Sequence, residues 1–581
     1  MRLACLLFCA SLACGGRVVP VADPPDAGCV GAACPPAPTC DPACPSWETC
    51  SGTTCVLPPG SCTTSSDCPD TLPICDPSHT CTAPAVTPPW TPSFTAALIT
   101  NAAYAGAFAP LAQLHTLTGV PTQLITVEAI CAVAPGGCSA TDACHDAAKA
   151  IKDWLIAQHA RGLRQVVLGG DAHVAPSRRT RAVYSNSIYG VDFDETFLSD
   201  YYFADLSEWD TNHDCVYGEP GSDSPGYLPT LGVTRVSASS LAEVQAYTAK
   251  ARAYLTTAPA ARALFLSNVA DSVTIPGIEV DVPIDAALYF QYPGRTLSLM
   301  PPSFEVTRLY SSLGAWPGAQ PLTISSERTA FERGQSLAIH SGHGAEEDLT
   351  VEQDGSNEFT GAMAHALQNA QTPILLSCAC DAATFADGDA CAGQQFITAP
   401  AGGGVGYLGN SATGLGIAGG MQLIDAMLRY SFAHSNPLAG EAVLAGHLNL
   451  PTSDTITIPN VPLVGSVALS VIDANSWRWT QKAATYLGDG LLPLYTDFTR
   501  QAAPAFTVRR EPIGAFSRLT FTPSRGVAGT LAVSAGAQLY QLAVAASGDP
   551  GSITVAGPVT TVALGFSSPG TLAGYTEVVL P

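Results

Sequence analysis

Two apolar runs that end in reactive side chains decide the fold class of this chain: LAIHSGHG at residues 337–344 and TPILLSCACD at residues 372–381. Each run has the length and aliphatic content of a buried strand and leads directly into histidine, glycine or cysteine. In a parallel sheet, catalytic groups gather beyond the carboxyl ends of the strands. If these strands are neighbours, His343 and Cys380 lie at one edge, as a thiol nucleophile and an imidazole require.

Around these runs, short apolar segments alternate with segments of helical periodicity, which predicts a doubly wound α/β fold with a parallel sheet. We divide this body into an N-terminal subdomain, residues 92–240, and a catalytic subdomain, residues 241–500. The predicted strands are Ala96–Thr100, Thr122–Val127, Gln165–Gly169, Ala263–Asn268, Ser303–Leu309, Ser336–His340, Pro373–Ser377 and Gly404–Leu408. The predicted helices are Phe108–Thr118, Ala143–His159, Ser326–Arg333, Glu358–Asn369 and Met421–Phe432.

The two ends of the chain have a different character. Residues 1–14 form a basic start and a short apolar run, which predict a signal peptide. The segment ending at Cys14 resembles a lipoprotein cleavage site, so simple secretion and a lipid-anchored surface protein both stay open. Residues 501–581 show short alternating strands with frequent turns, which predict an immunoglobulin-like β-sandwich.

Residues 15–91 hold ten cysteines, from Cys29 to Cys81, and few apolar residues. In an exported chain this composition predicts a disulfide-rich module followed by a proline-rich linker. Six cysteines besides Cys380 remain in the main body and could all pair. We expect a bridge among Cys131, Cys138 and Cys144, and a longer link from Cys378 or Cys391.

The balance of charge excludes one class of partner. The 581 residues carry 25 Lys and Arg against 48 Asp and Glu, a formal net charge of −23. Such a surface repels phosphate backbones, so no nucleic-acid partner is expected. The glycine-rich stretches lack the pattern of a phosphate-binding loop, and no cofactor is expected for catalysis.

The histidine and cysteine motifs resemble those of caspase-like cysteine peptidases and, within that group, the gingipain family. The resemblance continues in the same order along the chain and covers about residues 94–497. The further segments that carry it are Val166–Arg178, Ser199–Asp205, Gly232–Val236 and Tyr486–Asp489. The fold that it implies is a caspase-like parallel-sheet sandwich.

The resemblance also implies roles for single residues. Cys380 would attack a peptide carbonyl and form a thioester, and His343 would protonate the leaving amine. The backbone N–H groups of Gly344 and Cys380 would stabilise the oxyanion. An upstream acid would orient His343; we choose Asp271, with Asp281 and Asp285 as rivals. We expect His340 and Cys378 to be buried instead.

One acidic loop is a candidate metal site. Asp210, Asn212 and Asp214 place oxygen side chains at alternate positions, and Glu219 follows, although the spacing is not that of an EF-hand. Gingipain-like enzymes carry Ca²⁺ in this general region, so a structural Ca²⁺ ion is expected here. A solvated Asp/Asn turn is the alternative.

We therefore predict an exported cysteine endopeptidase that acts on proteins or peptides. It would be secreted or held at the cell surface, and would meet a membrane only through a lipid anchor. A transpeptidase or sortase-like member of the same family would use the same first step. A non-catalytic adhesin or binding protein is the alternative outside enzymes.

Overall fold

The computed structural model describes residues 43–581, apart from residues 47, 52–53, 187–190, 276–279, 312–315, 353–355, 387–389 and 462–464. The chain forms two compact units. The smaller holds the chain up to Pro84 together with Ile513–Ala515, and the larger holds Ala85–Pro512 and Phe516–Pro581. The predicted signal peptide with Cys14, and also Cys29, Cys34 and Cys40, lie outside the described residues.

The smaller unit is held by disulfide bonds. It contains two short hairpins, β1 (Thr49–Ser51) with β2 (Thr54–Val56) and β3 (Ile74–Cys75) with β4 (Cys81–Thr82). Its bridges are Cys44–Cys55, Cys62–Cys75 and Cys68–Cys81, and Cys50 is also disulfide-bonded. Because strands of two or three residues bury almost no apolar surface, the bridges supply the order, which confirms a disulfide-rich N-terminus.

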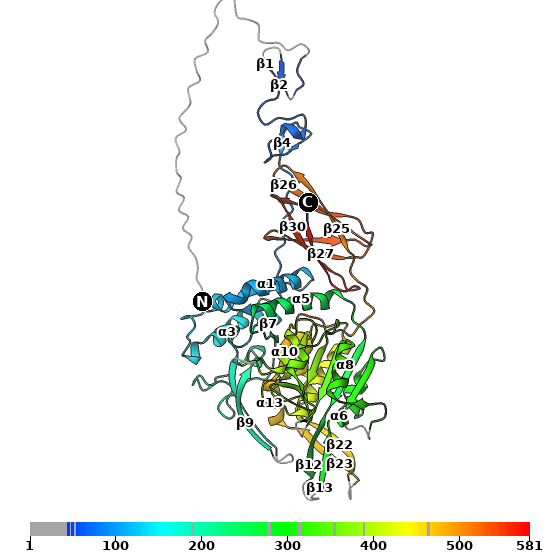
Figure 1. Ribbon diagram of the computed structural model, residues 1–581. Coiled ribbons are helices and arrows are strands. Elements are labelled where there is room, and N and C mark those ends of the chain that lie inside the picture. Colours follow the sequence, from blue (N-terminus) through cyan, green and yellow to red (C-terminus); the bar gives the residue numbers. More distant parts are fainter. Residues whose placement is uncertain are drawn as a thin grey trace, which may run out of the picture. The chain divides into compact units, whose positions relative to one another are not determined.

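The larger unit is built on one sheet of 11 strands with helices on both faces (Figure 1). The strands are, in sheet order, β15 (Gln320–Pro321), β14 (Glu305–Tyr310), β11 (Arg262–Ser267), β16 (Leu337–Ser341), β20 (Ile374–Ser377), β21 (Gly406–Asn410), β24 (Ala484–Gly488), β10 (Gly232–Val236), β7 (Gln165–Gly169), β5 (Ala96–Thr100) and β6 (Thr122–Thr126). Every neighbouring pair is parallel except β21 with β24. The sheet therefore consists of two parallel halves that run in opposite directions, and the prediction of a wholly parallel sheet was wrong at this one junction.

In the half of the sheet that contains β5, β7 and β10, the two faces belong to two hydrophobic cores. In β5, Leu98 packs in the core that contains Phe108 of α1 (Ala102–Leu117), whereas Ala97 and Ile99 pack in the core of α3 (Ala147–His159). Successive strand residues point to opposite faces, so a strand that is apolar at every position must be covered on both sides. This is why the central strands read as continuous apolar runs.

The end of the chain forms a β-sandwich. Strands β25 (Phe506–Ile513), β26 (Phe516–Pro523) and β29 (Gly551–Ala556) form one antiparallel sheet, and β28 (Gln538–Val544), β27 (Gly529–Ala535), β30 (Thr561–Ser567) and β31 (Gly574–Val579) form the other. Both sheets contribute to a single core. The sandwich packs on α1 and on α5 (Leu241–Thr256), which lie side by side (Figure 1), and Gln113 donates a hydrogen bond to Ser534 at 2.9 Å. The predicted proline-rich linker contacts the sandwich, and the Thr87 N–H donates to the Thr554 carbonyl at 2.9 Å.

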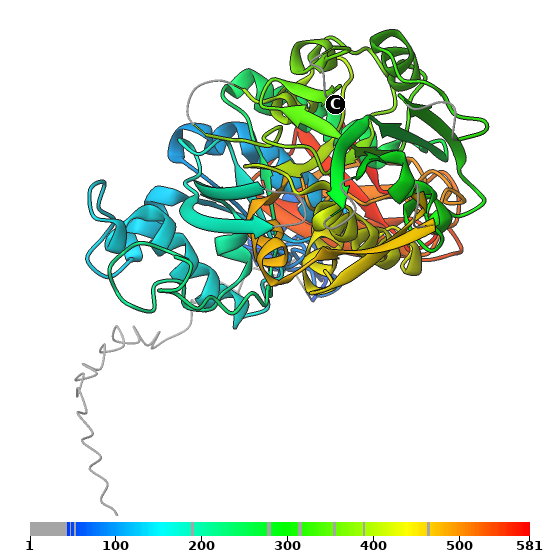
Figure 2. The same cartoon turned by 90° about the horizontal axis from the view of Figure 1, so that it is seen from below.

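Most predicted elements are confirmed to within two or three residues at each end, including all eight predicted strands of the central sheet. The predicted helix Glu358–Asn369 is shorter: β19 (Phe359–Thr360) comes first and α9 spans only Gly361–His365. Three long hairpins were not predicted: β8 (Arg178–Asn186) with β9 (Val191–Ser199), β12 (Val269–Ile275) with β13 (Val280–Asp285), and β22 (Asp454–Val461) with β23 (Gly465–Ile472). They extend from one end of the α/β body (Figures 1 and 2). Among the helices of the described residues, none is long and apolar enough to cross a membrane.

Candidate active site

The carboxyl ends of two neighbouring strands bring the predicted histidine and cysteine to one edge of the sheet. β16 and β20 pair in parallel with His340 opposite Ser377. His343 and Cys380 each follow three residues after this pair, and His343 opens the short strand β17 (His343–Ala345). The neighbour relation that the sequence argument required is therefore present.

The turns that carry these two residues are in direct contact. A Cβ atom on Gly344 would lie 2.7 Å from the Cβ of Ala379, which precedes Cys380. A Cβ atom on Gly342 would lie 2.6 Å from Asn268 Oδ1 and 3.0 Å from His340 Nε2. Since separations below 3.0 Å do not occur for a real side chain, both glycines are required for the turns to approach so closely.

The Cys380 thiol is partly exposed and unpaired. Its Sγ lies 3.6 Å from the Gly414 carbonyl, which accepts from the thiol. Burial raises the pKa of Cys380 to about 11, and the neighbouring charges of Asp381 and Glu195 act in the same direction. The free protein therefore holds a protonated thiol, and a base must take its proton before the sulfur can attack.

His343 has a ring nitrogen that is available for this proton. Its Nε2 is buried and, among the described residues, has no hydrogen-bond partner. Buried polar atoms without partners are rare, and those in native structures often mark a catalytic role. Nε2 of His343 is thus free to exchange a proton with a thiol or with a substrate.

His340 has a different environment. It is fully buried, with Nδ1 2.9 Å from Ser377 Oγ and Nε2 2.7 Å from Asn268 Oδ1. Burial lowers the pKa of His340 to about 3, with a smaller contribution from His343, so the ring is neutral. The expectation that His340 is buried is confirmed.

A chain of hydrogen bonds runs from this histidine in two directions. Ser377 Oγ accepts from the backbone N–H of Ala379 at 3.1 Å, next to Cys380. Asn268 Nδ2 donates to Glu352 Oε1 at 3.2 Å, and Ser311 Oγ donates to the same oxygen. The chain therefore links the residue before Cys380 to a carboxylate. Its members lie at or just after the ends of four neighbouring strands, β14, β11, β16 and β20, except Glu352, which follows β18 (Asp348–Val351).

The predicted orienting acids belong to the hairpin that directly follows Asn268. Asp271 belongs to β12, and Asp281 and Asp285 belong to β13. The structure describes only the backbone of these residues, so their side chains lie outside the described part. Asn268 and Glu352 were missed by sequence reasoning. Asn268 ends a predicted strand, which was a usable signal, but no sequence signal singles out Glu352.

Carboxylates also line the neighbourhood of Cys380. Glu195 accepts a hydrogen bond from Thr413 Oγ1 at 2.6 Å, one residue before Gly414. Burial and, to a smaller extent, the charges of Glu195 and Glu346 together raise the pKa of Asp381 to about 6. The thiol thus lies in a negative environment, which disfavours a thiolate in the free protein.

The other cysteines of the main body confirm a bridge among Cys131, Cys138 and Cys144, but the longer link differs from the expected one. The bridges are Cys131–Cys138 and Cys144–Cys215. Cys378 and Cys391 are buried and unpaired, so the expectation that one of them supplies a long link was wrong. Cys215 supplies that link because its loop packs against the segment that precedes α3. The burial of Cys378 was predicted correctly.

The predicted calcium loop is organised by its own hydrogen bonds. The carboxylate of Asp210 accepts the N–H groups of Asp214 and Cys215, and Asn212 donates to Asp214 at 2.7 Å. In the described part of the chain, Asp210, Asp214 and Glu219 do not belong to any cluster of acidic, histidine or cysteine ligand atoms close enough to share an ion. These contacts are those of an Asx turn, and we derive no chemistry through a metal at this loop.

Several segments that carry the family resemblance meet away from Cys380, around Arg235. The Arg235 guanidinium forms two hydrogen bonds with the Asp200 carboxylate, at 2.7 and 2.8 Å, and donates to carbonyls of the loop after β7. It also lies 4.5 Å from the ring centroid of Phe385, five residues after Cys380. These segments therefore hold the fold and fasten the loop that follows the thiol.

A parallel-dominated α/β sheet with a histidine and a cysteine beyond neighbouring strand ends defines the class of caspase-like cysteine peptidases. A model of peptidase family C25 matches residues 91–495. The chain belongs to this family, the gingipain family, which confirms the resemblance stated above.

Solved structures show the same fold. Gingipain R (RgpB), an Arg-specific cysteine proteinase, is 14% identical with a TM-score of 0.51, over 85% of this chain and 100% of the other. The complex of the pro- and mature domains of RgpB from Porphyromonas gingivalis is 14% identical with a TM-score of 0.50, over 84% of this chain and 100% of the other. Among curated protein sequences, none matches this chain.

Proposed function

We propose that this protein is an exported cysteine endopeptidase with Cys380 as nucleophile and His343 as acid and base. His343 Nε2 takes the proton of the Cys380 thiol, and Sγ forms a bond to the carbonyl carbon of a peptide. The C–N bond then breaks, and the same proton passes from His343 to the leaving amine. Water hydrolyses the thioester and releases the second product.

The observation that carries this proposal is the contact between the two turns. Gly344 lies against Ala379 with no space for a side chain, so the residues on either side, His343 and Cys380, are held at one sheet edge. Within the described part of the chain, Cys380 offers a thiol whose one acceptor is a carbonyl at 3.6 Å, and His343 offers a ring nitrogen without a hydrogen-bond partner. The backbone N–H groups of Gly344 and Cys380 would stabilise the oxyanion.

The hydrogen-bond chain through His340 would position this pair. Gly342 lies directly over Asn268 and His340, so the bond between these two side chains sets the height of the turn that leads to His343. The other end of the chain holds the Ala379 N–H beside Cys380. We infer that Asn268 and Glu352 are positioning residues. Two further proposals rest on the sequence alone. Asp271 would orient His343, and a structural Ca²⁺ ion would be held by Asp210, Asn212, Asp214 and Glu219.

Export is supported by the disulfide bonds in both units, because such bonds persist in oxidising compartments. We propose a secreted or surface-anchored protein, with Cys14 as the site of any lipid. The C-terminal sandwich would be an immunoglobulin-like module. Protein or peptide substrates follow from the family. No observation favours a transpeptidase or an adhesin.

The test uses the mature full-length chain with reductant, on a peptide library randomised at every position. Wild type should cleave the library and react at Cys380 with a thiol-directed acyl-type probe. Cys380→Ala should lose both, whereas Cys391→Ala, which removes a buried thiol, should keep both. Equal cleavage by wild type and Cys380→Ala would rule out the assigned nucleophile. An unlabelled Cys380 in folded protein would favour a non-catalytic protein.

A further inference from the structure

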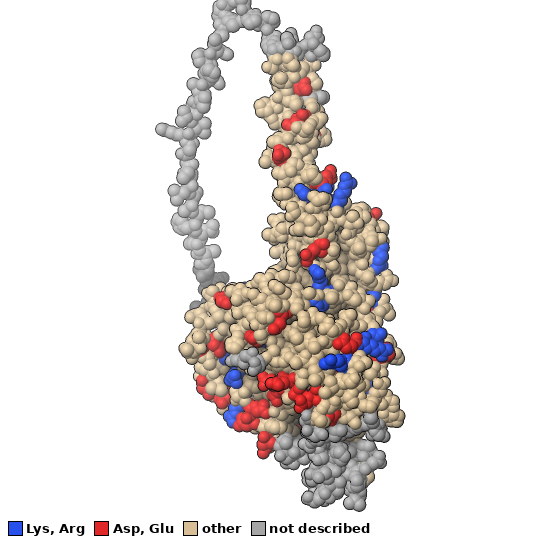
Figure 3. All heavy atoms as spheres, in the orientation of Figure 1, with Lys and Arg blue, Asp and Glu red and all other residues tan. Residues whose placement is uncertain are grey.

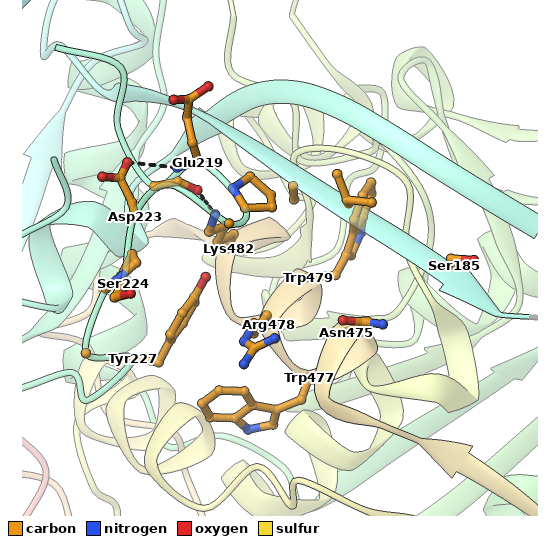
Figure 4. Close-up of a pocket in the computed structure, with 17 residues that line it drawn as sticks. Ser185, Glu219, Asp223, Ser224, Tyr227, Asn475, Trp477, Arg478, Trp479 and Lys482 are labelled. Carbon is orange, nitrogen blue, oxygen red and sulfur yellow. Dashed lines mark hydrogen bonds between the residues drawn. The ribbon is translucent and has the colours of Figure 1, made fainter. Parts of the chain in front are cut away.

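A cavity of about 540 Å³ lies beside the candidate active site, between the β8–β9 hairpin, the loop around Gly218–Tyr227 and α13 (Ala474–Ala483) (Figure 4). This volume falls in the range of about 300–1,000 Å³ typical of ligand pockets. Tyr227, Trp477 and Trp479 contribute aromatic side chains to its wall, and Arg478 and Lys482 contribute cationic ones. The family resemblance assigns it no role.

Two charged groups at one end of the cavity are already satisfied. Lys482 Nζ donates to the carbonyls of Arg181 and Gly218, at 2.8 and 2.6 Å. The Asp223 carboxylate accepts the backbone N–H groups of Thr211 and Glu219, at 2.8 and 2.9 Å. The Glu219 carboxylate lies at the same end and has no hydrogen-bond donor among the described residues, but Lys482 and Asp223 need no further partner.

Arg478 is different. Its side chain is exposed and, in the described part of the chain, forms no ion pair or hydrogen bond. Figure 4 shows Arg478 in the cavity near Tyr227 and Trp477, whose ring centroids are 5.4 Å apart. A planar guanidinium offers paired donors that match a carboxylate, and the rings beside it offer apolar surface.

The cavity shares a loop with the nucleophile. Trp479, in its wall, donates from Nε1 to the Thr413 carbonyl at 2.7 Å. The next carbonyl along the chain, that of Gly414, is the acceptor of the Cys380 thiol. A peptide held at Cys380 could therefore extend over this loop and reach the cavity.

We propose that this cavity is a substrate subsite that takes an acidic segment of a peptide, with one substrate carboxylate bound by Arg478. The proposal rests on the peptidase function proposed above, because a subsite serves a substrate that Cys380 cleaves. Binding of a peptide to the cavity, however, requires no reaction at Cys380. The net charge of −23 repels acidic peptides from the molecule as a whole, and acidic side chains gather over the α/β part on the face drawn in Figure 3. An acidic peptide that binds must therefore use a local cationic site.

The test measures direct binding to the full chain carrying Cys380→Ala, so that peptide is not consumed. The probes are acetyl-Asp-Phe-Glu-Ala-amide and its neutral twin acetyl-Asn-Phe-Gln-Ala-amide, followed by calorimetry and by tryptophan fluorescence. The acidic peptide should bind at least about tenfold more tightly than the twin, a difference typical of a charge-assisted hydrogen bond. Arg478→Gln should remove this preference, and Arg478→Lys should keep part of it.

The matched control is Arg161→Gln, which removes another exposed arginine with no side-chain partner among the described residues. It should leave binding unchanged. Equal binding of both peptides, no binding of either, or equal loss in the two arginine variants would each overturn the subsite. Cleavage of peptides by the wild type is measured separately, so failure of the subsite and failure of the peptidase function are distinguishable. Equal thermal midpoints of the variants establish that each is folded.

Discussion

Gly344 touches Ala379: a Cβ atom on the glycine would lie 2.7 Å from the Cβ of the alanine. This contact places the turn after β16 against the turn after β20, and it leaves no room for adjustment. Gly344→Ala should therefore displace His343 from Cys380 and lower kcat/KM by about 100-fold, since small misplacements of catalytic groups cost this much. Gly570→Ala, at an open position without a positive φ, is the control. Full activity of Gly344→Ala would contradict the proposed geometry.

The two histidines of the LAIHSGHG segment should separate activity from stability. His343→Gln should abolish cleavage with little change in the free energy of unfolding, because His343 Nε2 has no partner among the described residues. His340→Gln should lower the free energy of unfolding by about 1–3 kcal/mol, because it disturbs two buried hydrogen bonds. Urea unfolding and peptide cleavage measure the two effects. Loss of cleavage in His340→Gln, together with loss of stability in His343→Gln, would contradict the roles assigned to the two histidines.

The thiol of Cys380 should react slowly with iodoacetamide at neutral pH in the absence of substrate. Burial raises its pKa to about 11, so the thiolate fraction grows with pH until that value. The alkylation rate, followed at this residue by mass spectrometry, should therefore keep rising above pH 9. A plateau below pH 8 would indicate a thiolate paired with protonated His343 instead.

Glu327 should make stability depend on pH. It lies on α8 (Ile324–Glu332), is 1% exposed, and accepts one hydrogen bond from Thr350 at 2.9 Å. Burial raises its pKa from 4.5 to about 8. Below pH 4.5 the Glu327 carboxyl group is protonated in both the folded and the unfolded protein. Between pH 4.5 and 8 only the unfolded chain releases this proton. The free energy of unfolding therefore falls in this window and is constant above it.

Glu327→Gln should remove this contribution. The stability of the variant relative to wild type should increase from pH 4.5 to pH 8 by a few kcal/mol, because one pKa unit corresponds to about 1.4 kcal/mol. Urea unfolding at pH 4.5, 6 and 8 measures the difference. Glu332→Gln, on the same helix but exposed, is the control and should show no such trend. A difference that does not change with pH would contradict the assignment.

The buried pair of Arg235 and Asp200 should matter far more than an exposed pair of the same type. Asp200→Asn leaves a guanidinium that is 0% exposed without its counter-charge, which should cost about 3–5 kcal/mol. Asp194→Asn removes the partner of Arg181, whose side chain is 44% exposed, and should cost less than about 1 kcal/mol. Thermal and urea unfolding compare the two. Similar losses would contradict a structural role for Arg235.

Much of the fold could be predicted because its signals are local. The strand Gln165–Gly169 has the apolar run Val166–Leu168 at its centre, and a short aliphatic run that ends in glycine is typical of a buried strand in a parallel sheet. Strands β10 and β24 were missed, because GVTRV and ATYLG mix polar with apolar residues and become strands only through their neighbours. The hairpins that surround the site were missed for the same reason.

The sequence by itself determined the family, the strand ends that carry His343 and Cys380, and the disulfide-rich start, since each depends on residues close together in the chain. Only the tertiary structure decided that β21 and β24 run in opposite directions, that Cys215 and not Cys378 pairs with Cys144, and that Asn268 and Glu352 support the active edge. These facts depend on contacts between residues that are 71 or more positions apart in the sequence. Spacing along the chain carries no information about such contacts, because packing and not periodicity selects them.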